Sequence, residues 1–202
     1  MRKTLSLFFI LFLSLGVGTV SAAPVLDFGI DINEDSVFEN DFSIAPGGSQ
    51  AIDLYAVVTD DAVMDPLFLQ GFAVDLRYDS NLMNVTAASV DTLQWPFGAN
   101  ADFATDGSVV LKGGALNAPP GMPALLASIT FMCEAPGTSD LWVLDPDPSF
   151  DDFGLSNGAI LDDQLTGQVI GSVNQVPIPG AVWLLGSGIL GLIGLRRKGG
   201  ES

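Results

Sequence analysis

The chain has 202 residues, with 24 acidic and seven basic side chains, a formal net charge of −17 at pH 7, no histidine and one cysteine. This acidic excess argues against a nucleic-acid-binding surface, which needs Lys and Arg to displace phosphate counterions. The lack of histidine removes the usual general base at neutral pH and the commonest transition-metal ligand. A single cysteine cannot form an internal disulfide.

Residues 1–22 have the pattern of a secretory signal peptide. Arg2 and Lys3 precede an apolar run from Leu5 to Leu15, and small residues follow up to Ala23. This order of basic, apolar and small-residue regions predicts cleavage before Ala23 and export of the mature chain. An uncleaved membrane anchor is the alternative.

Residues 176–202 contain a second apolar segment, and a cluster of basic residues follows it: Arg196, Arg197 and Lys198. The apolar part, Ala181 to Leu195, would span about 22 Å as a helix, whereas a bilayer core is about 30 Å thick. Pro177 and Pro179 prevent a helix from continuing into the preceding body. We therefore expect a short transmembrane helix that acts as a processing signal more than as a permanent anchor.

The sequence Val176-Pro177-Ile178-Pro179, the apolar run and the pair Arg196-Arg197 resemble a PEP-CTERM sorting signal. Such tails occur on exported proteins of Gram-negative bacteria that produce exopolysaccharide. The resemblance implies an inner-membrane-anchored precursor, recognised by an exosortase-type transpeptidase and passed to the cell surface or extracellular matrix. Ile178 stands where the common form has Glu, which leaves the cleavage point open. An ordinary C-terminal anchor is the alternative, and it leaves the Pro-x-Pro motif unexplained.

Residues 23–175 carry nearly all the acids but only two basic side chains, Arg77 and Lys112. No segment of helical length in this body has a 3.6-residue period. Short alternating apolar stretches, separated by Gly, Pro, Asn and Asp, predict an all-β sandwich or jelly roll. The expected strands are Val25–Ile32, Ala51–Thr59, Gly71–Tyr78, Asn84–Val90, Ser108–Lys112, Leu125–Cys133, Ser139–Leu144 and Gly167–Val173.

Two of these strands show a clear two-residue period. One face of the segment 125–133 is wholly apolar and is expected to point inward: Leu125, Ala127, Ile129, Phe131 and Cys133. Cys133 is therefore expected to be a small core residue rather than a reactive thiol. In the segment 71–78, Asp75 and Arg77 lie opposite the apolar side chains and are expected to form a surface pair.

Two segments resemble cohesin domains. Gly71–Val85 contains a strand, Tyr-Asp, a turn, Leu and the next strand, and Leu125–Ser139 contains an Ile-x-Phe strand followed by a Gly-Thr turn. With Pro46-Gly47-Gly48 before a strand, the resemblance extends from about Asp31 to Val173. It implies a nine-stranded jelly-roll sandwich that binds partners without catalysis, the partner in cellulosomes being a dockerin. The family's partner-contacting residues cannot be transferred by motif.

Two groups of acids are candidate Ca²⁺ ligands, because Ca²⁺ takes 6–8 oxygen atoms. Asp31, Asn33 and Asp35 resemble the start of an EF-hand loop, but Ser36 replaces the required Gly and Phe42 replaces the final acid, so only a looser site is expected. The second group lies in one loop and consists of Asp145, Asp147, Asp151 and Asp152. Asp162 and Asp163, further along the chain, could join it. The alternative for both groups is a solvated loop.

Catalysis is not expected, because no acid lies in an apolar context that would raise its pKa as a glycosidase requires. Trp95 and Phe97 could stack on sugar rings from a loop. The sequence therefore predicts an exported, non-catalytic surface or matrix protein, with exopolysaccharide or a dockerin-like protein as partner. A calcium-dependent, lectin-like carbohydrate-binding module is the alternative.

Overall fold

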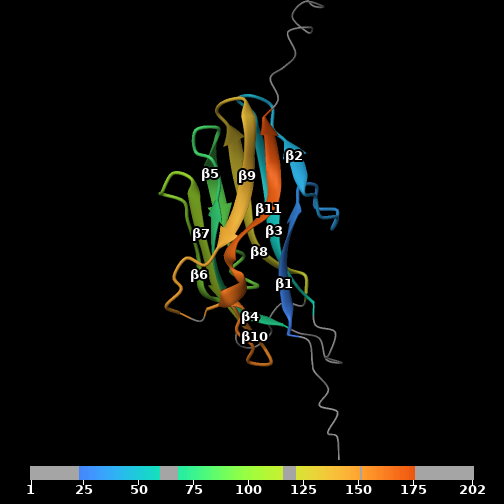
Figure 1. The fold of residues 1–202 in the computed structure, drawn as a ribbon, viewed down its shortest axis with the longest axis vertical. Coiled ribbons are helices and arrows are strands. Elements are labelled where there is room, and N and C mark those ends of the chain that lie inside the picture. Colours follow the sequence, from blue (N-terminus) through green and yellow to red (C-terminus); the bar gives the residue numbers. More distant parts are fainter. Residues whose placement is uncertain (1–22, 60–67, 116–121, 151, 176–202) are drawn as a thin grey trace, which may run out of the picture.

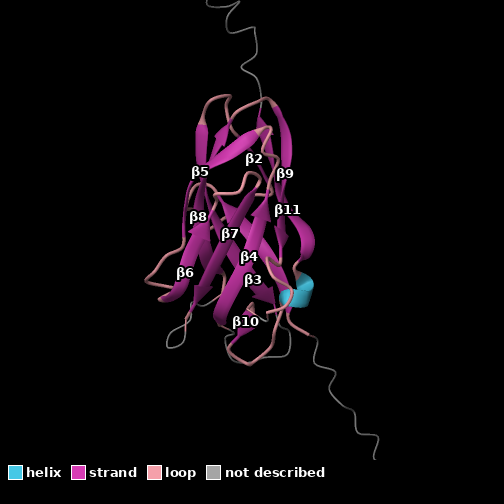
Figure 2. Cartoon of the chain, turned by 90° about the vertical axis from the view of Figure 1, so that its left-hand side faces the viewer, coloured by secondary structure: helices cyan, strands magenta, loops and turns pink. Residues whose placement is uncertain are grey.

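The computed structural model describes residues 23–59, 68–115, 122–150 and 152–175, which form two packed β-sheets (Figure 1). The smaller sheet has the order β1 (Val25–Asp31), β3 (Ser49–Thr59), β8 (Ala124–Cys133) and β5 (Met83–Ser89). The larger has the order β2 (Asp41–Ser43), β11 (Thr166–Gln175), β9 (Gly137–Leu144), β4 (Leu69–Arg77), β7 (Ser108–Gly114) and β6 (Phe97–Asp102), with β10 (Gly154–Leu155) beside β4. One 3-10 turn, η1 (Asp162–Gln164), precedes β11 (Figure 2).

The core lies between the sheets because alternate side chains of each strand point to the opposite sheet. Ile129 and Phe131 of β8 and Leu76 of β4 have no exposed surface. The rings of Tyr78 and Phe131 meet edge to face across the core, with centroids 5.5 Å apart. Aromatic pairs in this arrangement add about 0.5–1.5 kcal/mol beyond the area they bury.

The prediction of an all-β sandwich is confirmed, and each of the eight expected strands is present with ends within two residues of those expected. Cys133 is 1% exposed, as its inward position predicted. The structure also contains strands that alternation did not reveal, namely β2, β6 and β10. The described residues thus form eleven strands, where the cohesin resemblance implied nine.

Two expectations about side-chain position are wrong. Leu125 is only partly buried, whereas Leu126 has no exposed surface, because the register of β3 and β8 shifts between Leu54 and Tyr55. Asp75 pairs with Arg77 as expected but is 4% exposed, so the pair is not a solvated surface pair. Neighbouring strands enclose the carboxylate, which the isolated strand pattern does not reveal.

The predicted signal peptide (1–22) and the predicted sorting segment (176–202) lie outside the described residues. Within the part of the chain that the structure describes, no helix has the length and apolarity needed to span a bilayer.

Candidate functional site

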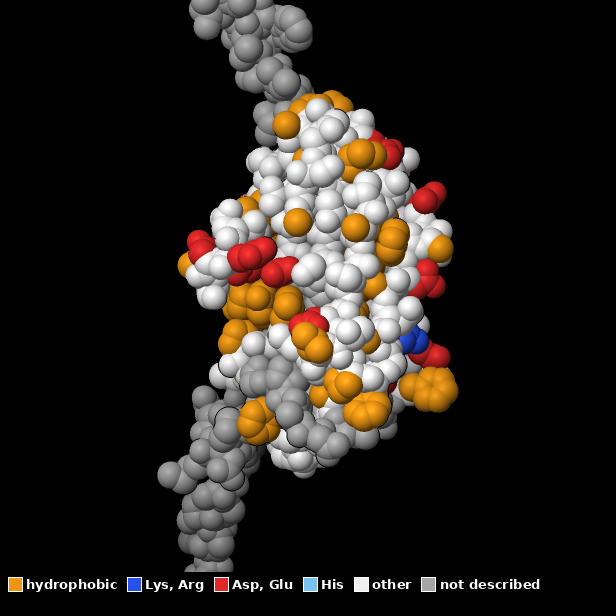
Figure 3. Space-filling view, turned by 180° about the vertical axis from the view of Figure 1, so that it is seen from behind, with side chains coloured by type: hydrophobic (Ala, Val, Ile, Leu, Met, Phe, Trp, Pro, Cys, Tyr) orange, Lys and Arg blue, Asp and Glu red, His pale blue; other side chains and the backbone are white. Residues whose placement is uncertain are grey.

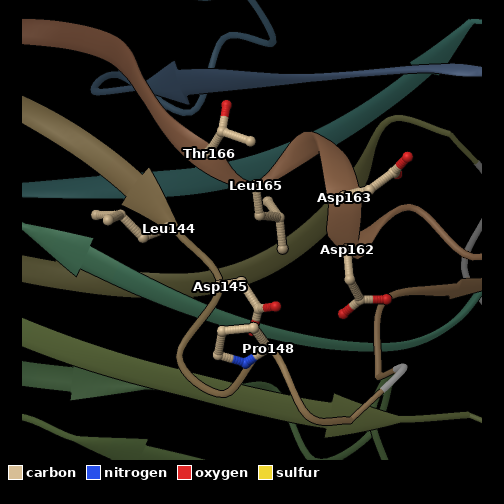
Figure 4. A pocket seen from close by; sticks show the side chains of 7 residues that line it. All are labelled: Leu144, Asp145, Pro148, Asp162, Asp163, Leu165 and Thr166. Atoms are coloured by element: carbon tan, nitrogen blue, oxygen red, sulfur yellow. The ribbon is translucent and has the colours of Figure 1, made fainter.

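Three carboxylates converge at the end of the sandwich where β9 ends and β11 begins. Asp145 follows β9, Asp152 precedes β10, and Asp162 opens η1; one oxygen of each lies within 4.8 Å of the other two. Asp145 and Asp162 also line a hollow of about 510 Å³. In Figure 4 both carboxylates face the same space, whereas Asp163 points away from it.

Backbone hydrogen bonds position this carboxylate cluster, as we call Asp145, Asp152 and Asp162. The Asp162 carboxylate accepts the N–H groups of Asp152 and Phe153 at 3.3 and 3.2 Å. The Asp145 carboxylate accepts the N–H of Asp147 at 2.8 Å. By contrast, Oδ1 of Asp152 is shielded from solvent and has no hydrogen-bond partner among the described residues. One acceptor of the cluster is therefore unsatisfied.

Burial first, and then the hydrogen bond to Asp162 and the charges of Asp162 and Asp145, together raise the pKa of Asp152 to about 6. Lys112 opposes this effect only in part. Near neutral pH the cluster therefore gathers negative charge at a cost in stability. A Ca²⁺ ion would remove that cost, because it takes carboxylates together with carbonyls and water as ligands.

The structure brings together only part of the predicted calcium set. Asp145 and Asp152 meet, and Asp162, ten residues further along the chain than Asp152, completes the cluster. Asp147 instead accepts the hydroxyl and the N–H of Ser149 at 2.6 and 3.2 Å. The Ser149 hydroxyl and then its N–H lower the pKa of Asp147. Asp151 lies outside the described residues.

The second predicted group, Asp31, Asn33 and Asp35, lies in a loop held by its own hydrogen bonds. Asp31 is 2% exposed, and its two oxygens accept the N–H groups of Asn33 and Ser36 at 3.0 and 2.8 Å. Burial alone would raise the pKa of Asp31, but these and neighbouring N–H donors together lower it. Asp35 accepts the N–H of Val37. These bonds explain the loop conformation without a cation.

The two residues of the predicted sugar-stacking pair differ in their exposure to solvent. The prediction that Trp95 stacks on a sugar at the surface is wrong, because its side chain has no exposed area. The indole N–H donates to the Leu125 carbonyl at 2.8 Å, and the ring packs edge-on against Phe72. Phe97, two residues later, is 50% exposed. Trp95 thus fixes the segment that leads into β6, and Phe97 is the member of the pair that a ligand can reach.

The outer face of the seven-stranded sheet combines apolar and charged side chains. Antiparallel register places Val169 of β11 and Arg77 of β4 on either side of Trp142 of β9. In the next row Asp75 lies between Leu144 and Val110. Trp142, Leu144 and Val110 are partly buried, while Val169 is 55% exposed. We call the residues of these two rows the outer-face rows.

The centre of this face is held by a buried polar network. The Asp75 carboxylate accepts the Ser108 hydroxyl at 2.6 Å through one oxygen and the Arg77 guanidinium at 2.6 Å through the other. Since charge-assisted hydrogen bonds are stronger than neutral ones, the network fixes β4 and β7 in register beneath the outer-face rows. Figure 3 shows the opposite side of the molecule, where acidic side chains stand out at both sides of the view, apolar side chains lie between them and few basic ones are seen.

No protein-family model matches the chain, and no curated protein matches it. Among solved structures, CaCohA2 from Clostridium acetobutylicum is 15% identical over 75% of this chain and 90% of its own, with a TM-score of 0.50. The structure of the complex of CaCohA2 with CaDoc0917 is 14% identical over 75% of this chain and 100% of the matched chain, also with a TM-score of 0.50. The sixth cohesin of scaffoldin B from Acetivibrio cellulolyticus, solved with a dockerin, is 11% identical over 75% and 99%, with a TM-score of 0.48. At these identities the similarity concerns the fold alone, and the fold is a cohesin-like β-sandwich.

Proposed function

We propose that this chain is an exported, non-catalytic binding module that an exosortase-type transpeptidase delivers to the cell surface or extracellular matrix of a Gram-negative bacterium. Its precursor is anchored in the inner membrane by the C-terminal apolar helix. The basic residues at both apolar termini and the Pro-x-Pro motif at Pro177 and Pro179 support this route.

The observation that carries the binding role is the open outer face of the seven-stranded sheet. Half-exposed Val169 and the partly buried Trp142 and Leu144 offer apolar area beside the fixed charge of Arg77. Aromatic and Arg side chains are enriched at the centres of protein interfaces. A solved complex of a chain with this fold, CaCohA2 with CaDoc0917, makes a dockerin-like protein one partner to consider. Exopolysaccharide is the other.

Processing can be tested by expressing the full chain in a host with and without its exosortase. Intact-mass spectrometry should find a chain that begins at Ala23 in both hosts. The chain should lack the tail only when the exosortase is present. The double variant P177A/P179A should keep the tail and remain in the inner membrane. A wild-type protein found with its full tail in an exosortase-containing host would contradict the proposal.

Binding through the outer-face rows can be tested with the mature protein as bait for isolated matrix material. Val169→Glu places a charge on the apolar rows and should abolish capture. Ala87→Glu, an exposed position of β5 on the other sheet, is the matched control and should leave capture unchanged. Equal capture by both variants would show that the partner binds elsewhere.

A calcium-dependent module is a second candidate, favoured by the convergence of Asp145, Asp152 and Asp162. Ca²⁺ at one hundred times its Kd should add about 2.7 kcal/mol to the free energy of unfolding. Thermal melting in EDTA and in CaCl2 measures this shift. Asp162→Asn should abolish the shift, whereas the Asp35→Asn control, in the other loop, should preserve it. A wild-type protein whose melting does not respond to Ca²⁺ would remove this candidate.

A further inference from the structure

A shallow trough lies at one end of the outer face of the seven-stranded sheet, beside the carboxylate cluster. It has a volume of about 350 Å³, and its lining comes from β4, β6, β7 and the loop before β10. This volume falls at the lower end of the range for small-ligand sites, about 300–1,000 Å³. Lys112, Phe97 and Asp152 are the side chains in its lining that offer specific chemistry.

Phe97 forms the aromatic wall of the trough. Its ring is 50% exposed, although a phenylalanine gains most stability when buried. The register of β6 and β7 shifts between Phe97 and Asn100, and Gly98 in between has φ of +64°, a conformation that glycine adopts without strain. The buried Trp95 holds the chain just before this bulge. The exposed ring is thus presented from a fixed backbone.

Glycines form the floor of the trough. Gly71 of β4 lies opposite Gly114 of β7, which in turn lies opposite Phe97. A Cβ at position 71 would lie 3.3 Å from the Asp152 carbonyl oxygen, and one at position 114 would lie 3.4 Å from the Phe97 carbonyl oxygen. Both glycines therefore keep open the space between the aromatic wall and the Asp152 side.

Hydrogen-bonding groups also line the trough. Asp152 brings its backbone carbonyl, which lies beside Gly71 and accepts hydrogen bonds, while exposed Lys112 brings an ammonium group, which donates them. A ligand in the trough would therefore meet an aromatic ring, an acceptor and a donor.

We propose that this trough binds one neutral sugar ring of a polysaccharide, seated on the glycine floor between Phe97 and Asp152. A pyranose ring fits this chemistry because one of its faces carries C–H groups that pack on an aromatic ring. Its hydroxyl groups both donate to a carbonyl oxygen and accept from an ammonium group. The inference rests on the proposed binding function and names a ligand class for a second site on the same face of the sheet.

The charges around the trough select against acidic sugars. Of the residues that the structure describes, Lys112 is the only basic one in the lining, whereas Asp152 lines the trough and Asp145 and Asp162 lie next to Asp152. A uronic acid would therefore meet net repulsion, which salt would screen. A neutral hexose would meet no such barrier.

Titration calorimetry on the full chain tests the proposal, in a detergent without sugar groups and in EDTA so that Ca²⁺ plays no part. The probes are hexasaccharides of β-linked glucose, mannose and galactose, with hexagalacturonate as the acidic member. At least one neutral probe should bind, and hexagalacturonate should bind at least tenfold more weakly. Phe97→Ala and Gly114→Val should each weaken the neutral probe at least tenfold, by loss of the aromatic wall and by filling of the floor. Phe103→Ala, which removes an exposed ring outside the trough lining, should change binding less than twofold.

Circular dichroism first confirms that each variant is folded. No binding of any neutral probe to folded wild-type protein would overturn the trough assignment, as would affinities that Phe97→Ala and Gly114→Val leave unchanged. If the chain captures a protein partner but binds no neutral probe, the assignment of the trough as a sugar site is overturned. The proposal that the chain is a binding module is then still supported. Failure of export or tail removal would instead refute the proposed function, whatever the calorimetry gives.

Discussion

Replacing Asp152 by Asn should stabilise the protein at neutral pH but not in acid. Burial and the carboxylates of Asp162 and Asp145 raise the pKa of Asp152 to about 6 in the folded state, above the ordinary value of 3.8. A group with a raised pKa contributes stability that is fully present below pH 3.8 and is lost as the pH rises to about 6. Above that pH the ionised carboxylate destabilises the fold, and an amide at this position avoids the charge.

The size of the effect follows from the two pKa values. At about 1.4 kcal/mol per pH unit, the difference between about 6 and 3.8 has an upper limit of about 3 kcal/mol. Asp152 is only partly buried, so solvent screening reduces the expected gain to about 1–2 kcal/mol. D152N should therefore exceed wild type by about 1–2 kcal/mol at pH 7.5 and match it near pH 4.

Urea unfolding in EDTA, followed by tryptophan fluorescence at several pH values, measures this difference. Asp147→Asn is the control with the opposite sign, because the Ser149 hydroxyl and N–H lower the pKa of Asp147. Its stabilising contribution is present above pH 3.8 and is lost as the pH falls, so D147N should be the less stable protein at neutral pH and approach wild type in acid. A difference between D152N and wild type that does not change with pH would refute the reasoning about the carboxylate cluster.

Substitutions at three further positions and one chemical probe test the rest of the fold. Trp95→Phe should cost about 1 kcal/mol in urea unfolding through loss of the hydrogen bond to Leu125, whereas Trp95→Ala should cost about 3–5 kcal/mol because it also leaves a cavity. Asp75→Ala should cost about 1–3 kcal/mol, since Ser108 and Arg77 lose their shared acceptor; full stability of this variant would show that the network contributes little. Gly171→Ala should lower stability by about 1–3 kcal/mol, because its Cβ would lie 2.8 Å from the Asn40 carbonyl oxygen. Cys133, at 1% exposure, should not react with a thiol reagent in the native protein but should react fully in 8 M urea, and rapid native labelling would contradict its place in the core.

Alternation predicted the long strands because each has one face in the core and one outside it. It did not predict β6, whose sequence Phe97-Gly-Ala-Asn-Ala-Asp102 has small side chains where large ones would mark an inward face. Ala99 and Ala101 are nevertheless packed against the core. A strand built on alanine and glycine gives too weak a periodic signal to separate from a loop.

Errors in side-chain position arose where a neighbouring strand decides the outcome. Leu125 and Leu126 are equally apolar, so no pattern in β8 alone could show that the register shift near Tyr55 turns Leu126 inward. The alternation placed Asp75 on the correct side of β4, but its low exposure depends on Ser108 and Arg77 and on the flanking strands.

The sequence predicted which types of residue form the candidate sites, but it predicted only some of the residues that come together there. Asp145 and Asp152 belong to one acidic loop and do meet, but Asp162 reaches them because the chain turns back through β10 and η1. Asp147, two residues after Asp145, is instead held by Ser149. Spacing along a loop does not determine which oxygens converge, because that depends on which backbone N–H groups bind each carboxylate.

Strand direction connects the proposed delivery route with the proposed ligand site. β11 begins at Thr166 beside Leu144 and ends at Gln175 beside Gly137, so the chain leaves the sandwich at the end opposite the carboxylate cluster (Figure 1). Pro24 and Leu26 bind Gln164 of η1, which places the first described residues at the cluster end. The Pro-x-Pro motif follows Gln175 with no spacer beyond Val176. A tail held in the membrane would then tether the far end of the sandwich, and the trough at Phe97, with the carboxylates beside it, would face away from that membrane.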